Sequence, residues 1–183
     1  VKNASFEVMD GQNMRLEDHS KDRVACQFGL MLFPDRAKGF SEIHRVLKPN
    51  GKAVISGWAD ASRFEAFALF MQAINVAFPN LPKPLNPPVF SLSDPDKFKL
   101  EMEAAGFYNV HVEYVSKAIT VNGANEIWGM LTTGAPPVKM LFDEIGLDGK
   151  EKVYDALKEI CATKYAGPQI TLMNTATIGV GTK

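Results

Sequence analysis

The chain has 183 residues, 46% of them hydrophobic and 22% charged, and a formal net charge of −1. This length fits one domain with a sizeable core, so we expect residues 1–183 to form a single domain. The small net charge argues against general attraction to nucleic acid, and no apolar run approaches the roughly 20 residues of a membrane span, so neither partner is expected.

The first predicted element is a strand over residues 4–9, where apolar and polar side chains alternate. Residues 10–13, Asp-Gly-Gln-Asn, form a turn in this interpretation. The polar stretch 16–21 then leads to the next strand, and its His19 is expected to be solvated.

Residues 22–58 are predicted to form a strand, a helix and a second strand. The apolar run over residues 24–33 is typical of a strand that is buried on both faces of a parallel sheet. Residues 48–51, Lys-Pro-Asn-Gly, end the helix, and residues 53–58 form a second buried strand. The helix stripe that faces the sheet comprises Phe40, Ile43, Val46 and Leu47.

Four blocks of this region resemble a known family. They are Asp22, the run Cys26-Gln27-Phe28-Gly29-Leu30-Met31, the triplet Phe33-Pro34-Asp35, and the longer run Glu42-Ile43-His44-Arg45-Val46-Leu47-Lys48-Pro49-Asn50-Gly51. Together they resemble the second half of a class I S-adenosylmethionine-dependent methyltransferase, of the branch grouped with ubiquinone and menaquinone biosynthesis. The family usually carries R-V-L-K-P-G-G in the last block, so Asn50 is a mild departure at a turn.

The resemblance implies the cofactor-binding residues. Loops at the carboxyl ends of parallel strands form the ligand crevice in such folds. By resemblance, the adenine contacts are Asp10, Gly11 and Gln12. The contacts to the methionine part of S-adenosylmethionine are Gln27, Phe28 and Gly29. The alternatives are an ordinary Asp-Gly turn at the first site, and a core phenylalanine beside a glycine bulge at the second.

Residues 63–78 are predicted to form a helix that is too apolar to face water on most sides. It therefore needs cover from the sheet, from a cap or from another chain. In the resembling family, a helix after this strand often belongs to a lid over the methyl acceptor. On that reading the substrate-binding residues are Phe64, Phe67 and Met71, and a plain core or dimer contact is the alternative.

The next elements are a connector, a helix and a strand. Residues 79–88 contain five prolines and are expected to be extended. Asp94 is the expected N-cap of a helix that has Pro95 in its first turn and ends at Gly106. Residues 110–115 alternate as a half-buried strand.

The last part of the chain is predicted to hold three helices and a strand. The helices span residues 125–131, 138–145 and 150–163, with a Gly-Ala-Pro-Pro break at residues 134–137. Residues 175–181 form the closing strand, which is antiparallel in the resembling family. Its glycines indicate close packing or an edge position.

The predicted fold class is therefore α/β: an incomplete Rossmann-like methyltransferase sheet, mostly parallel, with an antiparallel C-terminal strand and helical cap insertions at residues 61–92 and 124–167. The family's glycine-rich turn does not occur in these 183 residues. We therefore expect the chain to match the last two-thirds of that fold and to be inactive alone. The strand at residues 4–9 then either fills the vacancy in the sheet or two copies join their edges.

The expected activity is methyl transfer from S-adenosylmethionine to a small apolar or aromatic acceptor. No catalytic base is assigned, because the three histidines are better explained structurally, and no metal site is expected. The alternative is a methyltransferase-like interaction module that binds a partner through residues 63–78. A homodimer through the sheet edge or through that helix is a further option. Cys26 and Cys161 are typical of reduced core residues, which favours a cytoplasmic protein, although a targeting peptide before Val1 would be invisible.

Overall fold

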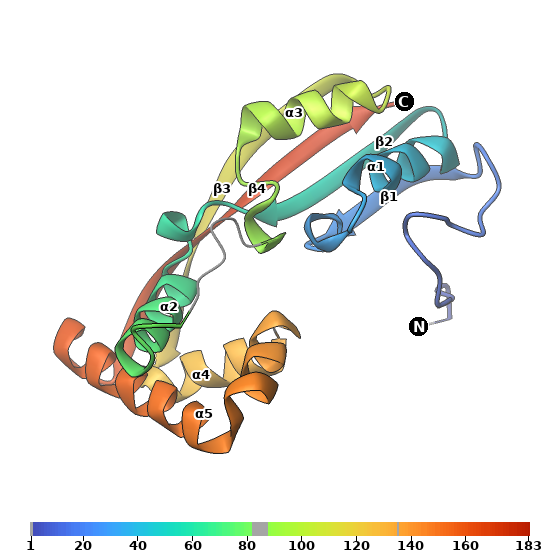
Figure 1. The fold of residues 1–183 in the computed structure, drawn as a ribbon. Coiled ribbons are helices and arrows are strands. Elements are labelled where there is room, and N and C mark those ends of the chain that lie inside the picture. The colour runs from blue at the N-terminus through green and yellow to red at the C-terminus, as the bar shows by residue number, and fades with distance from the viewer. Residues whose placement is uncertain (1, 82–87, 135) are drawn as a thin grey trace. The chain divides into compact units, whose positions relative to one another are not determined.

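The computed structural model describes residues 2–81, 88–134 and 136–183 (Figure 1). The chain folds as two compact units. Unit 1 comprises residues 1–59, 86–115 and 176–183, and unit 2 comprises residues 60–85 and 116–175. Most of the expected proline-rich connector, residues 82–87, lies outside the described residues.

The strands form one mixed sheet with the order β1-β2-β4-β3. β1 and β2 are parallel, with Gln27 opposite Ser56, and β2 and β4 are antiparallel, with Ser56 opposite Ile178 (Figure 1). The α/β class and the antiparallel C-terminal strand are therefore confirmed. The bounds are Lys21–Gln27 for β1, Leu47–Trp58 for β2, Tyr108–Asn122 for β3 and Gln169–Thr182 for β4.

The helix between β1 and β2 confirms the predicted strand–helix–strand unit. α1 spans Arg36–Val46, and the side chain of its N-cap, Asp35, accepts a hydrogen bond from the Lys38 N–H. The predicted apolar stripe packs on the sheet, with Phe40, Ile43 and Val46 buried. Asn50 takes a positive φ of 63° in the turn within β2, as the Asn-Gly pair predicted.

The apolar run at residues 24–33 differs from the prediction in two ways. The strand ends at Gln27, and Leu30–Leu32 form a short 3₁₀ helix, η1. Only one face of β1 is covered, since Ala25 is exposed while Val24 and Cys26 are partly buried. The prediction of a strand buried on both faces was wrong, because α1 and α3 supply core side chains to one face and the run's most apolar residues leave the strand.

Residues 4–9 form no strand, so that prediction was also wrong. They are irregular, and the side chains of Phe6 and Val8 are 94% and 93% exposed. Alternating side chains make a strand only when a neighbouring strand accepts their hydrogen bonds, and no described strand pairs with this segment.

The second helix of unit 1, α3 (Pro95–Ala104), begins and ends as predicted. The Asp94 carboxylate accepts from the Asp96 and Lys97 N–H groups, and Gly106 takes a φ of 99° just after the helix. Its buried side chains pack against the end of β4, where a Cβ on Gly179 would lie 2.8 Å from Phe98 Cζ. The glycines of β4 therefore mark close packing, since β4 lies between β2 and β3 and is not an edge strand.

Unit 2 is built from three helices and the remaining halves of β3 and β4. α2 spans Glu65–Ala77, α4 spans Gly123–Gly134, and α5 spans Pro136–Lys164 with a non-helical Gly146 inside it. The two helices expected at residues 138–145 and 150–163 are the two parts of α5 on either side of that glycine. Their shared core includes Ile74, Ile127, Val153, Leu157 and Leu172.

The cover of the apolar helix α2 is provided within the chain. Its buried side chains, among them Leu69 and Phe70, belong to one core cluster with residues of α4 and α5. The interaction-module alternative rested on an apolar face that needs a partner, and this packing removes that reason for it.

Candidate functional site

The candidate site lies at the carboxyl ends of β1 and β2. The parallel register places Gln27 opposite Ser56, so residues 27–29 and 56–58 emerge at the same edge of the sheet. In open α/β sheets, this edge forms the ligand crevice when neighbouring parallel strands end there. The geometry is therefore the one that the sequence predicted for residues 27–29.

Phe28 makes the tightest contact between the two strand ends. Its backbone N–H donates to both the carbonyl and the hydroxyl oxygen of Ser56, at 3.1 and 3.2 Å. Its ring stacks on Trp58 with centroids 4.2 Å apart. The residue also adopts a positive φ of 52°, which is uncommon for a bulky side chain. This strained position, set by neighbouring contacts, ends β1 sharply.

Gly29 opens the turn into η1. The carbonyl of Gly29 accepts from the Leu32 N–H at 3.0 Å. A Cβ placed on Gly29 would meet Cys26 Sγ at 3.2 Å and, leaving its chain neighbours aside, no other described atom within 4 Å. Apart from Cys26 Sγ, the position of a Gly29 Cβ is thus unobstructed, and the absence of a side chain lets a ligand approach the backbone.

The other predicted cofactor segment, residues 10–12, forms the turn that the sequence predicted. The Asn13 N–H donates to the Asp10 carbonyl, and the Gln12 N–H donates to the Asp10 carboxylate at 2.9 Å. The Gln12 side-chain oxygen accepts from the Asp35 N–H at 2.8 Å. A Cβ on Gly11 would lie 2.5 Å from Phe33 Cζ, so this glycine is needed for packing whether or not it touches a base.

Both predicted segments border the connection between β1 and α1. Residues 27–29 begin that connection, and residues 11–12 contact it at Phe33 and Asp35. The side-chain amide of Gln12 is already hydrogen-bonded within the protein, to Asp10 and Asp35, so this residue supports the loop. The Asp10 side chain is exposed. Assignment of all six residues to the cofactor stays a prediction.

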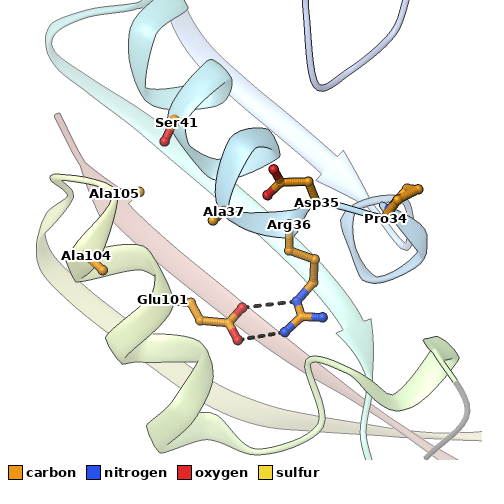
Figure 2. Close-up of a pocket in the computed structure, with 8 residues that line it drawn as sticks. All are labelled: Pro34, Asp35, Arg36, Ala37, Ser41, Glu101, Ala104 and Ala105. Atoms are coloured by element: carbon orange, nitrogen blue, oxygen red, sulfur yellow. Dashed lines mark hydrogen bonds and ion pairs between the residues drawn. The ribbon is translucent and has the colours of Figure 1, made fainter.

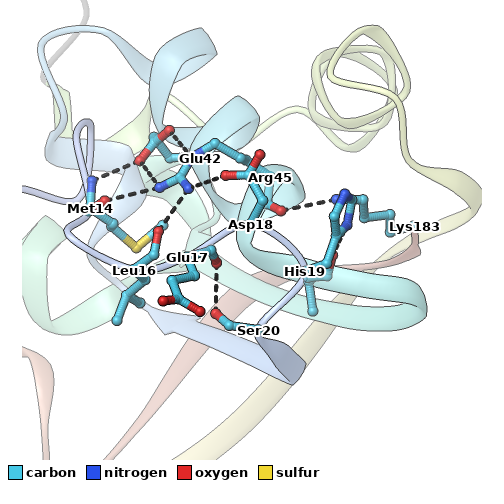
Figure 3. Close-up of polar contacts among 10 residues, drawn as sticks. Met14, Leu16, Glu17, Asp18, His19, Ser20, Glu42, Arg45 and Lys183 are labelled. Atoms are coloured by element: carbon cyan, nitrogen blue, oxygen red, sulfur yellow. Dashed lines mark hydrogen bonds and ion pairs between the residues drawn. The ribbon is translucent and has the colours of Figure 1, made fainter.

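A group of hydrogen bonds around Arg45 binds residues 14–18, which follow the turn of residues 10–13 (Figure 3). Arg45 pairs with Glu42 through two hydrogen bonds, at 2.7 and 2.9 Å, and with Asp18 at 2.6 Å. It also donates to the carbonyls of Met14 and Leu16. We name these five residues the Arg45 cluster. Sequence analysis named Glu42 and Arg45 only as members of a block that resembles the family, and it did not predict these contacts.

The charges in the Arg45 cluster stabilise one another. The hydrogen bonds from Arg45 are the main reason that the pKa of Glu42 lies below its ordinary value. The carboxylates of Glu42 and Asp18 raise the pKa of Arg45. Glu42 and Arg45 are therefore charged at neutral pH, and the hydrogen bonds between them are of the stronger, charge-assisted kind.

The three histidines have structural contacts. His44 packs edge-on against Phe107, with ring centroids 5.1 Å apart, and burial is the main cause that lowers its pKa. This contact is a structural one, as expected for the histidines. The His19 Nδ1 lies 3.2 Å from the Leu47 carbonyl, and exposed His111 lies 3.7 Å from Glu113.

A hollow of about 580 Å³ lies between α1 and α3 (Figure 2). Arg36 and Glu101 face each other across it in a pair of hydrogen bonds of 3.1 and 2.8 Å, which raise the pKa of Arg36. The rest of the lining combines small apolar residues, Ala37, Ala104 and Ala105, with Pro34, Asp35 and Ser41. None of the predicted site residues lines this hollow.

The predicted acceptor residues all belong to unit 2. The rings of Phe64 and Phe67 stack with centroids 6.0 Å apart, and Phe64 and Met71 pack against the core of the unit while staying partly exposed. Among the described residues, no group of three or more His, Cys, Asp or Glu side chains could hold a metal ion. In the same part of the chain, no helix is long and apolar enough to cross a membrane.

Comparison with known proteins gives a consistent result. Residues 1–55 match the family model described as "Methyltransferase domain". The chain is 33% identical over 82 residues to a demethylmenaquinone methyltransferase of Bacteroides fragilis, covering 45% of this chain and 34% of the relative. It is 30% identical over 127 residues to a ubiquinone/menaquinone biosynthesis C-methyltransferase of Geotalea uraniireducens, covering 64% of this chain and 54% of the relative. The chain thus spans about half or less of the length of these relatives.

Solved structures agree on the fold. A protein of Bacillus halodurans, described as a candidate methyltransferase, superposes with a TM-score of 0.54 over 96% of this chain and 75% of that chain, at 17% identity. A protein from an antibiotic biosynthesis pathway of Anabaena variabilis, described in the same way, gives a TM-score of 0.52 over 92% of this chain and 70% of that chain, at 16% identity. At these identities the likeness shows the fold alone.

Proposed function

We propose that the chain is part of a class I S-adenosylmethionine-dependent methyltransferase, as its matches to a methyltransferase family model and to two quinone-biosynthesis methyltransferases support, and that the whole protein transfers a methyl group to a small apolar or aromatic acceptor. The observation that carries this proposal is the parallel pairing of β1 and β2, which brings residues 27–29 and 56–58 to one crevice-forming edge. The names of the two curated relatives refer to menaquinone and ubiquinone, which favours an aromatic acceptor.

The residues at this edge suit the cofactor chemically. Gln27 is exposed at the strand end, where its amide oxygen can accept from the ammonium group of the methionine part. The open backbone at Gly29 allows close approach, and the aromatic pair of Phe28 and Trp58 borders the same edge. Asp10 offers a carboxylate to the amino group of adenine. S-adenosylmethionine supplies an already activated methyl group.

The protein's contribution to the reaction is mainly alignment of the acceptor and exclusion of water, because the methyl group needs little further activation. A hydroxyl or acidic carbon acceptor would also require a proton acceptor within hydrogen-bond reach. Among the described residues we assign none to this function. The aromatic pair of Phe64 and Phe67, together with Met71, is proposed to contact the acceptor.

The test is a methyl-transfer assay with the full-length protein and a panel of phenols and quinols, with S-adenosylmethionine carrying a labelled methyl group. We expect transfer to at least one aromatic acceptor. Residues 1–183 alone should transfer no label and bind S-adenosylmethionine only weakly. The reason is that β1 is an edge strand, which pairs with β2 on one side and with no described strand on the other. Failure of the full-length protein to bind the cofactor at millimolar concentration would refute the proposal.

Replacing Phe67 by alanine is expected to raise the KM for the aromatic acceptor about 10-fold and to leave the KM for S-adenosylmethionine within twofold, because the proposal places this ring against the acceptor and not against the cofactor. Val76→Ala on the same helix is the matched control, since its side chain is 58% exposed. Steady-state kinetics of the full-length protein give both values. An unchanged acceptor KM would remove Phe67 from the acceptor site.

A further inference from the structure

We propose that Arg45 is a positioning residue: it fixes residues 14–18 on α1 and thereby places the loop of residues 10–12 for the adenine of the methyl donor. The inference rests on the proposed function, because it assumes that this loop contacts adenine. Figure 3 shows the contacts that support it.

The Arg45 cluster binds both N–H and carbonyl groups in the main chain of residues 14–16. The Arg45 guanidinium donates to the Met14 and Leu16 carbonyls at 2.9 and 2.7 Å. Its partner Glu42 accepts from the Met14 N–H at 2.7 Å. The backbone of Met14 is thus bound through its donor and its acceptor, which leaves this residue little freedom to move away from the helix.

Arginine is the side chain that this arrangement requires. The guanidinium reaches two carboxylates and two carbonyls in different directions, which a single ammonium group cannot do with comparable geometry. The Arg45 and Glu42 side chains are only 30% and 15% exposed, so their pairing is less screened than that of a surface salt bridge.

The loop is fixed to α1 at two separate points. Met14 directly follows the turn of residues 10–13, and the other fixed point is the bond between Gln12 and the Asp35 N–H at the start of the helix. Asp35 and Arg45 are ten residues apart, or about 15 Å along the helix axis. Residues before the loop are fixed less firmly. Glu7 pairs with Arg15, but these side chains are 54% and 67% exposed, so the ion pair contributes little to stability.

The predicted consequence is recognition of the base. The exocyclic amino group of adenine can donate to the Asp10 carboxylate, whereas hypoxanthine presents a carbonyl at that position and would be repelled. A loop in the correct place therefore distinguishes S-adenosylhomocysteine from S-inosylhomocysteine. A loop released by loss of Arg45 would make this distinction poorly.

The experiment measures the affinity of the full-length protein for both compounds by titration calorimetry, in wild type, Arg45→Met, Arg45→Lys and Arg36→Met. Arg36 is the matched control, because it also lies on α1 and binds a carboxylate with two hydrogen bonds but does not contact residues 10–18. We expect wild type to prefer S-adenosylhomocysteine by at least 10-fold. Arg45→Met should reduce this preference to less than threefold, Arg45→Lys should have an intermediate value, and Arg36→Met should keep the preference.

The positioning function would be contradicted if Arg45→Met weakened the binding of both compounds by the same factor. It would also be contradicted if Arg36→Met reduced the preference for S-adenosylhomocysteine as much as Arg45→Met does. Lack of any binding by wild type would refute the proposed function itself, and this inference with it. Amide hydrogen exchange on residues 1–183 is a second measurement that needs no cofactor. It should show at least 10-fold faster exchange of the Met14 N–H in Arg45→Met and no such change in Arg36→Met; unchanged exchange in Arg45→Met would overturn the proposal.

Discussion

Replacing Phe98 by alanine is expected to lower the free energy of unfolding of unit 1 by about 3–5 kcal/mol. The Phe98 side chain is 1% exposed and packs between α1 and the sheet. Its ring lies 6.0 Å from that of Phe40, and the backbone of Gly179 approaches it so closely that no Cβ would fit. Such rigid surroundings cannot collapse into the cavity, which places the cost in the upper part of the range for core truncations.

Chemical denaturation of residues 1–183 measures this loss. The chain has two tryptophans, Trp58 in unit 1 and Trp128 in unit 2, so fluorescence in a Trp128→Phe background reports on unit 1 alone. Phe70→Ala is the matched control, because Phe70 is equally buried in unit 2. Phe70→Ala should shift the unfolding transition of unit 2, which the fluorescence of Trp128 reports in a Trp58→Phe background. A loss below about 1 kcal/mol on Phe98→Ala would contradict the packing described here.

Replacing Gly29 by leucine is expected to weaken S-adenosylmethionine binding by the full-length protein at least 100-fold. The φ of Gly29 is −100°, so its backbone accepts a side chain without strain, and unit 1 should lose little stability. The Cβ of the added side chain would meet Cys26 Sγ, and the rest of the side chain would extend into the space beyond the strand end. That space is where we propose that the methionine part of the cofactor binds.

Titration calorimetry and a thermal melt separate the two effects of this substitution. Gly29→Ala should weaken binding less than leucine does, because one methyl group fills less of the space. Gly129→Leu is the control for a leucine at another glycine, since a Cβ there meets no described atom within 4 Å. Wild-type affinity in Gly29→Leu, with an unchanged melting temperature, would show that the cofactor does not bind over this strand end.

The strand–helix–strand unit was predictable because local signals agree over residues 22–58. The stripe of Phe40, Ile43 and Val46 has helical spacing, and the Asn-Gly pair at residues 50–51 marks the turn. The ends of α3 were predictable for the same reason, with Asp94 as N-cap and Gly106 at the other end. Each of these signals lies within a few residues of the element that it specifies.

The errors concern features that depend on distant partners. Residues 4–9 alternate like a strand, but pairing is a property of two strands, and no described strand lies beside them. The two-sided burial expected for residues 24–33 failed because helix cover is set by the rest of the fold. For α2, the need for cover was evident from its sequence, but its covering helices α4 and α5 were not.

The candidate site was predictable in part. Family resemblance and strand order together placed residues 27–29 at the sheet edge, as the register shows. The Arg45 cluster was missed because the carbonyls of Met14 and Leu16 are main-chain acceptors, which leave no mark in a sequence. The only available signal was the i, i+3 spacing of Glu42 and Arg45 on one helix.

The most direct test of the central claim is an amide chemical-shift titration of the ¹⁵N-labelled full-length protein with S-adenosylhomocysteine. If the ends of β1 and β2 form the cofactor site, the largest shifts will occur at residues 27–29 and 10–12, with smaller ones at Ser56 and Trp58. Shifts confined to the α1–α3 hollow around Arg36 and Glu101, or to unit 2, would contradict it.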